Sequence, residues 1–213
     1  MTNRRVLTAL IICHLLVWWV VTTGNAQTPA ATANSYLDRG NALAAKGKWE
    51  RAIADFDVAI AFDHNFARAY YNRAVVRYRQ GSLAEALDDF DRAIQLDLRL
   101  TEAYVDRAGV RYLLGDPDGA ISDSNRAIEL NPRLAAAWNN RGLARVLKGD
   151  HAGALADFNR SIKLDPRRAE TYNNRGVVRF HLRDLDGAIG DQTQAVKLKP
   201  DFAEAYTDRG AAG

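Results

Sequence analysis

Aromatic, small and charged positions recur along this chain with a period of 34 residues. Each period carries an aromatic residue, an Arg three positions later and a small residue directly after that Arg. The aromatic members are Tyr36, Tyr70, Tyr104, Trp138, Tyr172 and Tyr206. Self-similarity at a fixed period of this size predicts a solenoid, in which each unit buries its apolar face against the next.

Each period is predicted to hold two helices. With Ala33 as position 1 of the first unit, the first helix should span about positions 2 to 14 and end at a glycine. Asp116 stands where the second helix needs an N-cap acceptor. In the first unit, Phe56 and Ile60 lie four residues apart and place apolar side chains on one face of the second helix.

The same period sets the domain boundaries that we predict. Residues 1–26 form a leader and residues 27–32 a small, polar linker. The array has its units at 33–66, 67–100, 101–134, 135–168 and 169–202, with a partial unit at 203–213. Because the sixth unit stops within its first helix, we expect the sequence to be a fragment of a longer protein; a partner covering that end is the alternative.

The remaining recurrent positions complete a pattern that resembles the tetratricopeptide repeat. Positions 8, 20 and 27 are small, position 24 is Phe56, Phe90 or Phe158 in three units, and position 32 is Pro132, Pro166 or Pro200 in three units. The resemblance covers 33–213 and implies an all-α fold, a right-handed α-solenoid of stacked helix–turn–helix units with a concave partner-binding surface. Ser124 and Gln192 depart from the pattern at position 24.

Position 7 is Arg in every unit and position 23 is Asp in every complete unit, whereas the typical family residue at position 7 is Leu. A helical hairpin can bring these positions together, so we expect an Arg–Asp ladder along the array. Its members include Arg73, Arg107, Arg141, Arg175, Asp89, Asp123, Asp157 and Asp191. The planar guanidinium pairs with a carboxylate at two points, and the predicted role is to set register. The alternative is that these arginines bind an anion.

Helix-face geometry, taken with the resemblance, directs several positions of the first helices toward a concave groove. The predicted groove residues are Arg68, Tyr71, Asn72, Arg79, Glu102, Asn139, Asn140, Glu170, Asn173, Asn174 and His181. The Asn amides can bond an extended peptide backbone, because each offers a donor and an acceptor; the alternative is that they only bond neighbouring helices. The carboxylate-clamp subgroup of the family needs Lys where this chain has Leu37, so binding of chaperone tails is not supported.

The N-terminal segment is typical of a secretory signal. Arg4 and Arg5 precede the apolar run Val6–Val21, and small residues at Gly24 and Ala26 predict cleavage after Ala26. The expected location is the bacterial periplasm or the exterior of the cell. The alternative is an uncleaved anchor in the inner membrane formed by residues 6–21.

Composition and histidine spacing narrow the chemistry. The formal net charge is +3 and becomes +1 if Arg4 and Arg5 leave with the leader, so no nucleic-acid partner is indicated. The only cysteine, Cys13, lies in the leader, so the mature chain would hold no thiol nucleophile. His64, His151 and His181 fall at unrelated unit positions. We therefore predict no catalytic site, no metal and no cofactor.

The sequence as a whole predicts an exported, non-enzymatic scaffold that binds a protein or peptide in the groove of the array. Two alternatives stay open. The array could be the accessory region of a longer enzyme, or a membrane-tethered assembly factor whose leader is retained.

Overall fold

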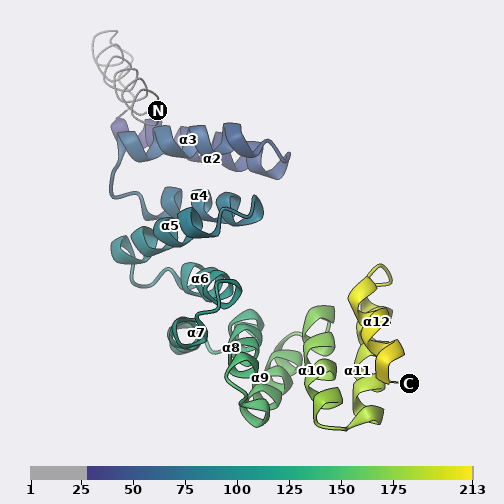
Figure 1. Cartoon of the computed structure of the whole chain (residues 1–213). Helices are drawn as coiled ribbons and strands as arrows, with labels where there is room; N and C mark the ends of the chain where they lie inside the picture. Colours follow the sequence, from purple (N-terminus) through teal and green to yellow (C-terminus); the bar gives the residue numbers. More distant parts are fainter. Residues whose placement is uncertain (1–27, 213) are drawn as a thin grey trace. The chain divides into compact units, whose positions relative to one another are not determined.

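The computed structural model describes residues 28–212, and every regular element in that range is an α-helix (Figure 1). The helices are α2 (Pro29–Ala45), α3 (Trp49–Phe62), α4 (Ala67–Arg79), α5 (Leu83–Leu96), α6 (Thr101–Leu113), α7 (Pro117–Leu130), α8 (Ala135–Leu147), α9 (His151–Leu164), α10 (Ala169–His181), α11 (Leu185–Leu198) and α12 (Ala203–Ala212). The predicted leader lies outside the described residues.

Consecutive helices pair as hairpins, one in each 34-residue unit. α2 packs on α3, α4 on α5, α6 on α7, α8 on α9 and α10 on α11, and α12 is the first helix of the next unit. The prediction of an all-α solenoid of stacked helical hairpins is confirmed.

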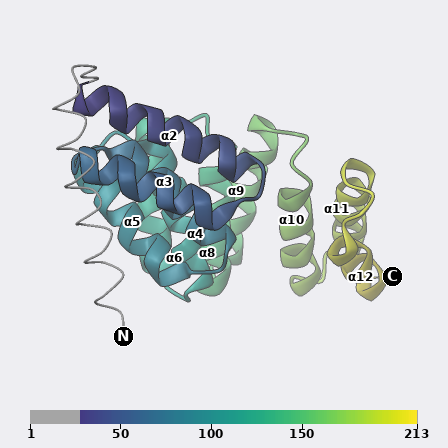
Figure 2. The same ribbon diagram turned by 90° about the horizontal axis from the view of Figure 1, so that it is seen from above.

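The chain divides into two compact units, Met1–Leu98 and Arg99–Gly213. In the described part of Met1–Leu98, α3 packs against both α2 and α4. In the described part of Arg99–Gly213, α10 contacts α8, α9, α11 and α12. Figure 2 shows α10, α11 and α12 side by side. No helix between residues 28 and 212 has the length and apolarity that a membrane span requires.

Left-handed residues and aspartate caps explain the turn inside each hairpin. The first helices of four units end at glycines with φ between 68° and 81°, a conformation that glycine adopts without strain. Arg183 takes the same place in the fifth unit with φ of 65°. Asp116, Asp150 and Asp184 then cap the second helices, each through Oδ1, which accepts a hydrogen bond from a glycine N–H three residues later.

The first helix starts earlier than the repeat pattern predicts. α2 begins at Pro29, inside the segment 27–32 that we expected to be a linker. Thr28 caps it, because its Oγ1 accepts a hydrogen bond from the Ala31 N–H at 3.2 Å. Pro at the first helical position and the alanines after it favour the helix, so residues 29–32 are helical although they are small and polar.

The core runs between the two helices of each hairpin, where a small residue faces an aromatic ring. A Cβ placed on Gly40 would lie 2.6 Å from Cε1 of Phe56, and Gly142 stands in the same relation to Phe158. These rings are fully buried. Close approach of the helix axes therefore depends on the small residue at position 8.

Candidate partner-binding surface

The predicted Arg–Asp pairs meet between the two helices of each hairpin. In the second hairpin, Arg73 donates from Nε to Asp89 Oδ2 at 2.9 Å and from Nη2 to Asp89 Oδ1 at 2.6 Å. The same two-point pairing joins Arg39–Asp55, Arg107–Asp123, Arg141–Asp157 and Arg175–Asp191. The structure thus brings together every ladder pair that the sequence singled out.

Each Arg–Asp pair is one rung of the ladder. In the second to fifth hairpins a second arginine, at position 11, bonds the same Asp. In the fourth, Arg145 donates from Nη1 to Asp157 Oδ2 at 2.8 Å, so the buried carboxylate of Asp157 receives three charged hydrogen bonds. Arg77, Arg111 and Arg179 occupy the equivalent place. The first hairpin has Leu43 there, and its Arg39 side chain is 62% exposed, against 15% for Arg141.

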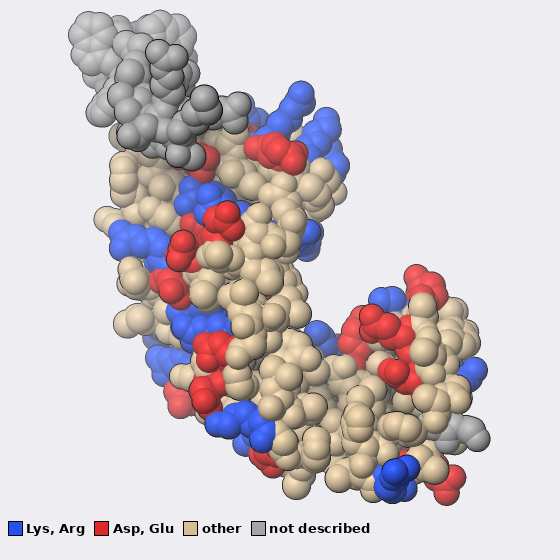
Figure 3. Space-filling view, viewed as in Figure 1, with Lys and Arg blue, Asp and Glu red and all other residues tan. Residues whose placement is uncertain are grey.

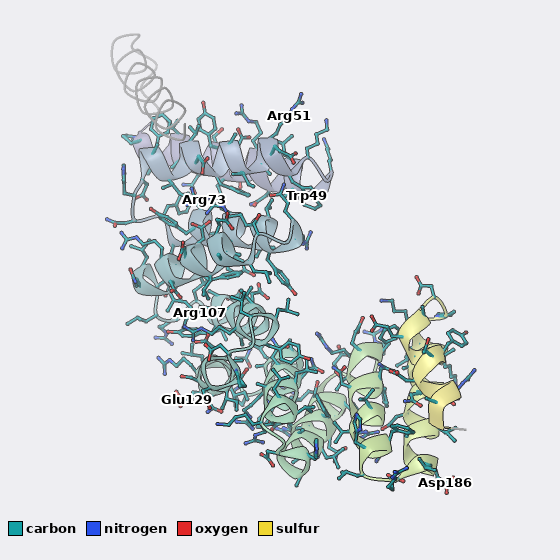
Figure 4. The ribbon with its side chains drawn as sticks, viewed as in Figure 1. Trp49, Arg51, Arg73, Arg107, Glu129 and Asp186 are labelled. Atoms are coloured by element: carbon teal, nitrogen blue, oxygen red, sulfur yellow. The ribbon has the colours of Figure 1, made fainter. Side chains whose placement is uncertain are left out.

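The position-7 arginine also reaches the preceding hairpin. Arg73 on α4, labelled in Figure 4, donates to Asp89 on α5 and, through Nη1, to Asp57 on α3. Arg141 donates in the same way to Asn125, and Arg175 to Asn159. Its guanidinium also lies over the aromatic ring at position 4. In the fourth hairpin, for example, Cζ of Arg141 lies 4.6 Å from the centroid of the Trp138 ring.

These contacts leave the ladder arginines little capacity for an external anion. Burial opposes the charge of Arg73, but its bonds to Asp89 and Asp57 outweigh that effect and raise the pKa of the guanidinium above its ordinary value. The hydrogen bond to Asp55 likewise raises the pKa of Arg39. The geometry favours the structural role over the anion-binding alternative.

The Asn side chains at position 6 bond the preceding first helix. Asn72 Nδ2 donates to Asn41 Oδ1 at 2.6 Å, and Asn174 Nδ2 donates to Asn139 Oδ1 at 3.1 Å. Asn140 Nδ2 donates to the Val105 carbonyl at 2.9 Å, again across 35 residues of sequence. The Nδ2 groups of these amides therefore tie adjacent first helices together, as the alternative predicted, whereas the Asn72 oxygen takes no part in these bonds.

Two predicted groove residues lie beneath the surface. Asn139 and Asn173 at position 5 are 3% and 5% exposed, because neighbouring first helices cover them. Asn139 Oδ1 accepts a second bond from Thr171, whereas Asn173 Nδ2 donates to Asp208 on α12 at 3.1 Å. Helix-face geometry placed position 5 on the groove but did not show how closely the adjacent helix approaches it.

The other predicted groove residues are accessible. Arg68, Arg79, Glu102, Glu170 and His181 are exposed, and Tyr71 is half-buried. Arg79 stands 5.9 Å from the Trp49 ring centroid, and Arg68 stands 5.5 Å from that of Tyr71. Glu170 lies 3.6 Å from the Lys199 ammonium.

The first and second hairpins together line a hollow of about 260 Å³ between α2 and α4. Phe56 and Val76 form its apolar floor, while Asn41, Tyr71 and Arg79 supply polar groups at its wall. The Asn72–Asn41 bond uses one donor and one acceptor, and it leaves Nδ2 of Asn41 and Oδ1 of Asn72 for a ligand. Sequence reasoning named Tyr71, Asn72 and Arg79 but missed Asn41, which occupies the groove position 9 of the first unit.

Between residues 28 and 212, no three His, Cys, Asp or Glu side chains converge in a way that could hold a metal ion. His181 is exposed at the end of α10, and its ring packs edge-on against Phe180. The accessible chemistry of the surface is therefore that of amides, aromatic rings and charged side chains.

Comparison with known proteins agrees with this architecture. A family model described as TPR repeat matches residues 40–81, and one described as Tetratricopeptide repeat matches 67–98 and 135–168. No curated protein sequence matches the chain.

Several solved structures share the fold. YrrB, a TPR protein with an unusual peptide-binding site, is 26% identical over 82% of this chain and 90% of its own, with a TM-score of 0.65. TTC0263, a thermophilic TPR protein of Thermus thermophilus, is 21% identical over 84% and 98%, with a TM-score of 0.69. MamA of Desulfovibrio magneticus RS-1 is 17% identical over 81% and 97%, with a TM-score of 0.70.

Proposed function

We propose that this chain, in which residues 40–98 and 135–168 match tetratricopeptide-repeat models, is a non-enzymatic scaffold that binds an extended protein segment along the first helices of its hairpins. Proteins with this repeat generally bind other proteins. One observation carries the proposal for this chain, namely the hollow between α2 and α4, with its apolar floor and its amide, aromatic and cationic wall.

The chemistry of that hollow suits a peptide. Phe56 and Val76 can bury an apolar side chain, and the free amide groups of Asn41 and Asn72 can bond one peptide unit as donor and acceptor. Arg79 and Arg68 are exposed and can attract an acidic side chain of the partner. YrrB, which has a peptide-binding site, supports the proposal by likeness.

Selection of displayed random peptides on the purified full chain tests the proposal. Peptides that bind the wild type should bind Tyr71→Ala or Arg79→Ala at least about ten-fold more weakly, since a few central aromatic and Arg contacts dominate such interfaces. Arg51→Ala is the matched control, because it removes an exposed Arg from the second helix α3 (Figure 4). Failure to select any peptide, or equal binding to all four proteins, would count against the function.

We propose further that the chain is exported. The support is the basic, apolar and small-residue order of residues 1–26. Removal after Ala26 would leave the Thr28 cap and the whole of α2 intact. The mass of the protein isolated from its native cells tests this: a chain that begins at Gln27 supports cleavage, and a chain that retains Met1 supports the membrane-tethered alternative.

A further inference from the structure

The core residue at unit position 24, which we call the floor of a hairpin, differs between the fifth hairpin and the first, second and fourth. Position 24 is Phe in those three hairpins and Gln192 in the fifth, where it is 1% exposed. Its Oε1 has no hydrogen-bond partner. A buried amide oxygen without a partner lowers the free energy of unfolding by about 1–3 kcal/mol. A hydrogen-bond donor placed at Gln192 Oε1 would therefore be favourable.

Asn173 adds a second buried acceptor. It is 5% exposed, and its Oδ1 also lacks a partner. Tyr71 and Phe90 stand at the same two unit positions in the second hairpin, with ring centroids 6.0 Å apart. The repeat therefore places Asn173 and Gln192 beside one another, on α10 and α11.

Carboxylates of α12 complete the surroundings. Asp208 Oδ2 accepts the hydrogen bond from Asn173 Nδ2, so the Asn173 amide and the Asp208 carboxylate are in contact. Glu204 lies four residues earlier on α12, on the same helix face, and is exposed. Figure 3 shows acidic side chains gathered over α12 and the loop before it. The nearby Lys199 is paired with Glu170.

We propose that this cluster, formed by Asn173, Gln192, Glu204 and Asp208, is a binding site for an arginine side chain of a basic segment in the partner protein. The inference rests on the proposed scaffold function and names the chemistry of one partner contact. A guanidinium carries five N–H donors and no acceptor, which matches a cluster that combines two carboxylates with two buried amide oxygens that lack a donor.

The same oxygens suit a metal ion less well. Asn173 turns its Nδ2 toward Asp208, so an N–H donor stands at the carboxylate that a metal would need. A guanidinium can pair with the outer carboxylate oxygens and donate to the buried Oδ1 and Oε1 with its remaining N–H groups.

Fluorescence anisotropy with the purified full chain tests the site. The probe is a labelled, unstructured Gly-Ser peptide with three Arg residues, compared with versions that carry citrulline or Glu in their place. Citrulline keeps most of the N–H groups but removes the charge. We expect the Arg peptide to bind and the citrulline peptide to bind at least about ten-fold more weakly.

Two variants locate the binding. Asp208→Asn removes one charge, and Gln192→Phe restores the ring that Phe56 and Phe158 place against Gly40 and Gly142. Each should weaken binding of the Arg peptide about ten-fold. Gln192→Phe should melt no lower than the wild type, because Gly176 leaves room beside position 24. Asp186→Asn is the matched control, because it removes an exposed charge from the first turn of α11 (Figure 4). This variant should bind the Arg peptide as tightly as the wild type.

The outcomes separate this site from the general function. If Asp208→Asn and Gln192→Phe bind as tightly as the wild type, or citrulline binds as well as Arg, the arginine site is wrong. If the Glu peptide alone binds and Arg79→Ala abolishes that binding, the scaffold function stands and the arginine site is wrong. If calcium raises the melting temperature while no peptide binds, the cluster is a metal site. If none of the three peptides binds and calcium has no effect, the arginine site fails, and the displayed-peptide selection then decides the scaffold function separately.

Discussion

A double-mutant cycle on Arg141 and Asp157 gives the strongest test of the ladder. Asp157 is 2% exposed and accepts bonds at 2.9 and 2.7 Å from Arg141 and at 2.8 Å from Arg145. Asp157→Leu leaves two arginine side chains, 15% and 28% exposed, facing each other without their carboxylate. Orphaning a buried charge costs about 3–5 kcal/mol.

The other two corners of the cycle follow from the same contacts. Arg141→Leu leaves Asp157 paired with Arg145, so we expect a loss of about 1–3 kcal/mol. The double variant orphans only Arg145, which already lies 3.6 Å from Asp150 and can turn toward it. The double variant should therefore cost no more than Asp157→Leu alone, a coupling of about 1–3 kcal/mol.

Urea unfolding of the full chain, followed by circular dichroism at 222 nm, measures these losses without added salt that would screen the charges. Constant m-values across the four proteins are required, because repeat arrays can lose cooperativity. Arg126 and Glu129 are the control pair, since both are exposed on one helix and should couple by less than about 0.5 kcal/mol. If the two single losses add to within about 0.5 kcal/mol in the double variant, the ladder reasoning is refuted.

Three smaller predictions use the same unfolding assay. Arg39→Leu should cost about 3–5 kcal/mol although Arg39 itself is mostly solvated, because Asp55 is 6% exposed and Leu43 stands where the later hairpins have a second arginine; a loss below about 1 kcal/mol would contradict the ladder argument. Gly190→Ala should raise the free energy of unfolding by about 0.5–1 kcal/mol, since a Cβ at this position of α11 meets nothing within 4 Å. Gly149→Ala should lower the free energy of unfolding, because its φ of 76° strains an Ala. Effects of the same sign in the two variants would contradict this prediction. Arg183→Gly should raise stability by about 1 kcal/mol, because φ of 65° strains an Arg; an unchanged midpoint would show that this strain is negligible.

The ladder was predictable because both partners of a rung belong to one hairpin. Arg and Asp lie 16 residues apart in every pair, and the spacing recurs in all five complete units. A contact that repeats at a fixed separation within a unit leaves a mark in the sequence that can be recognised without a structure. The hairpin turns were predictable for the same reason, with Arg183 as the departure.

The groove was harder to predict, because its contacts join different units. Asn72 bonds a residue 31 positions back, and Asn174 bonds one 35 positions back. The partner differs from unit to unit, so no recurrent pair marks the contact. Whether an Asn faces solvent or a neighbouring helix depends on how closely the adjacent helix packs, which a periodic pattern does not specify.

The positions that hold each hairpin and the positions proposed for partner binding are consequently different. Positions 4, 7, 8 and 23 recur and hold each hairpin, whereas positions 2, 5, 6 and 9 vary between units. The fifth hairpin shows how far this separation extends, because Gln192 replaces a core Phe while Arg175 and Asp191 still form their full rung. Since the ladder fixes the hairpin without that ring, a polar floor can be introduced without loss of register. The unsatisfied oxygens of the proposed arginine site are thus held in place by ladder residues that are not part of that site, so the proposed partner contact can change while the fold is kept.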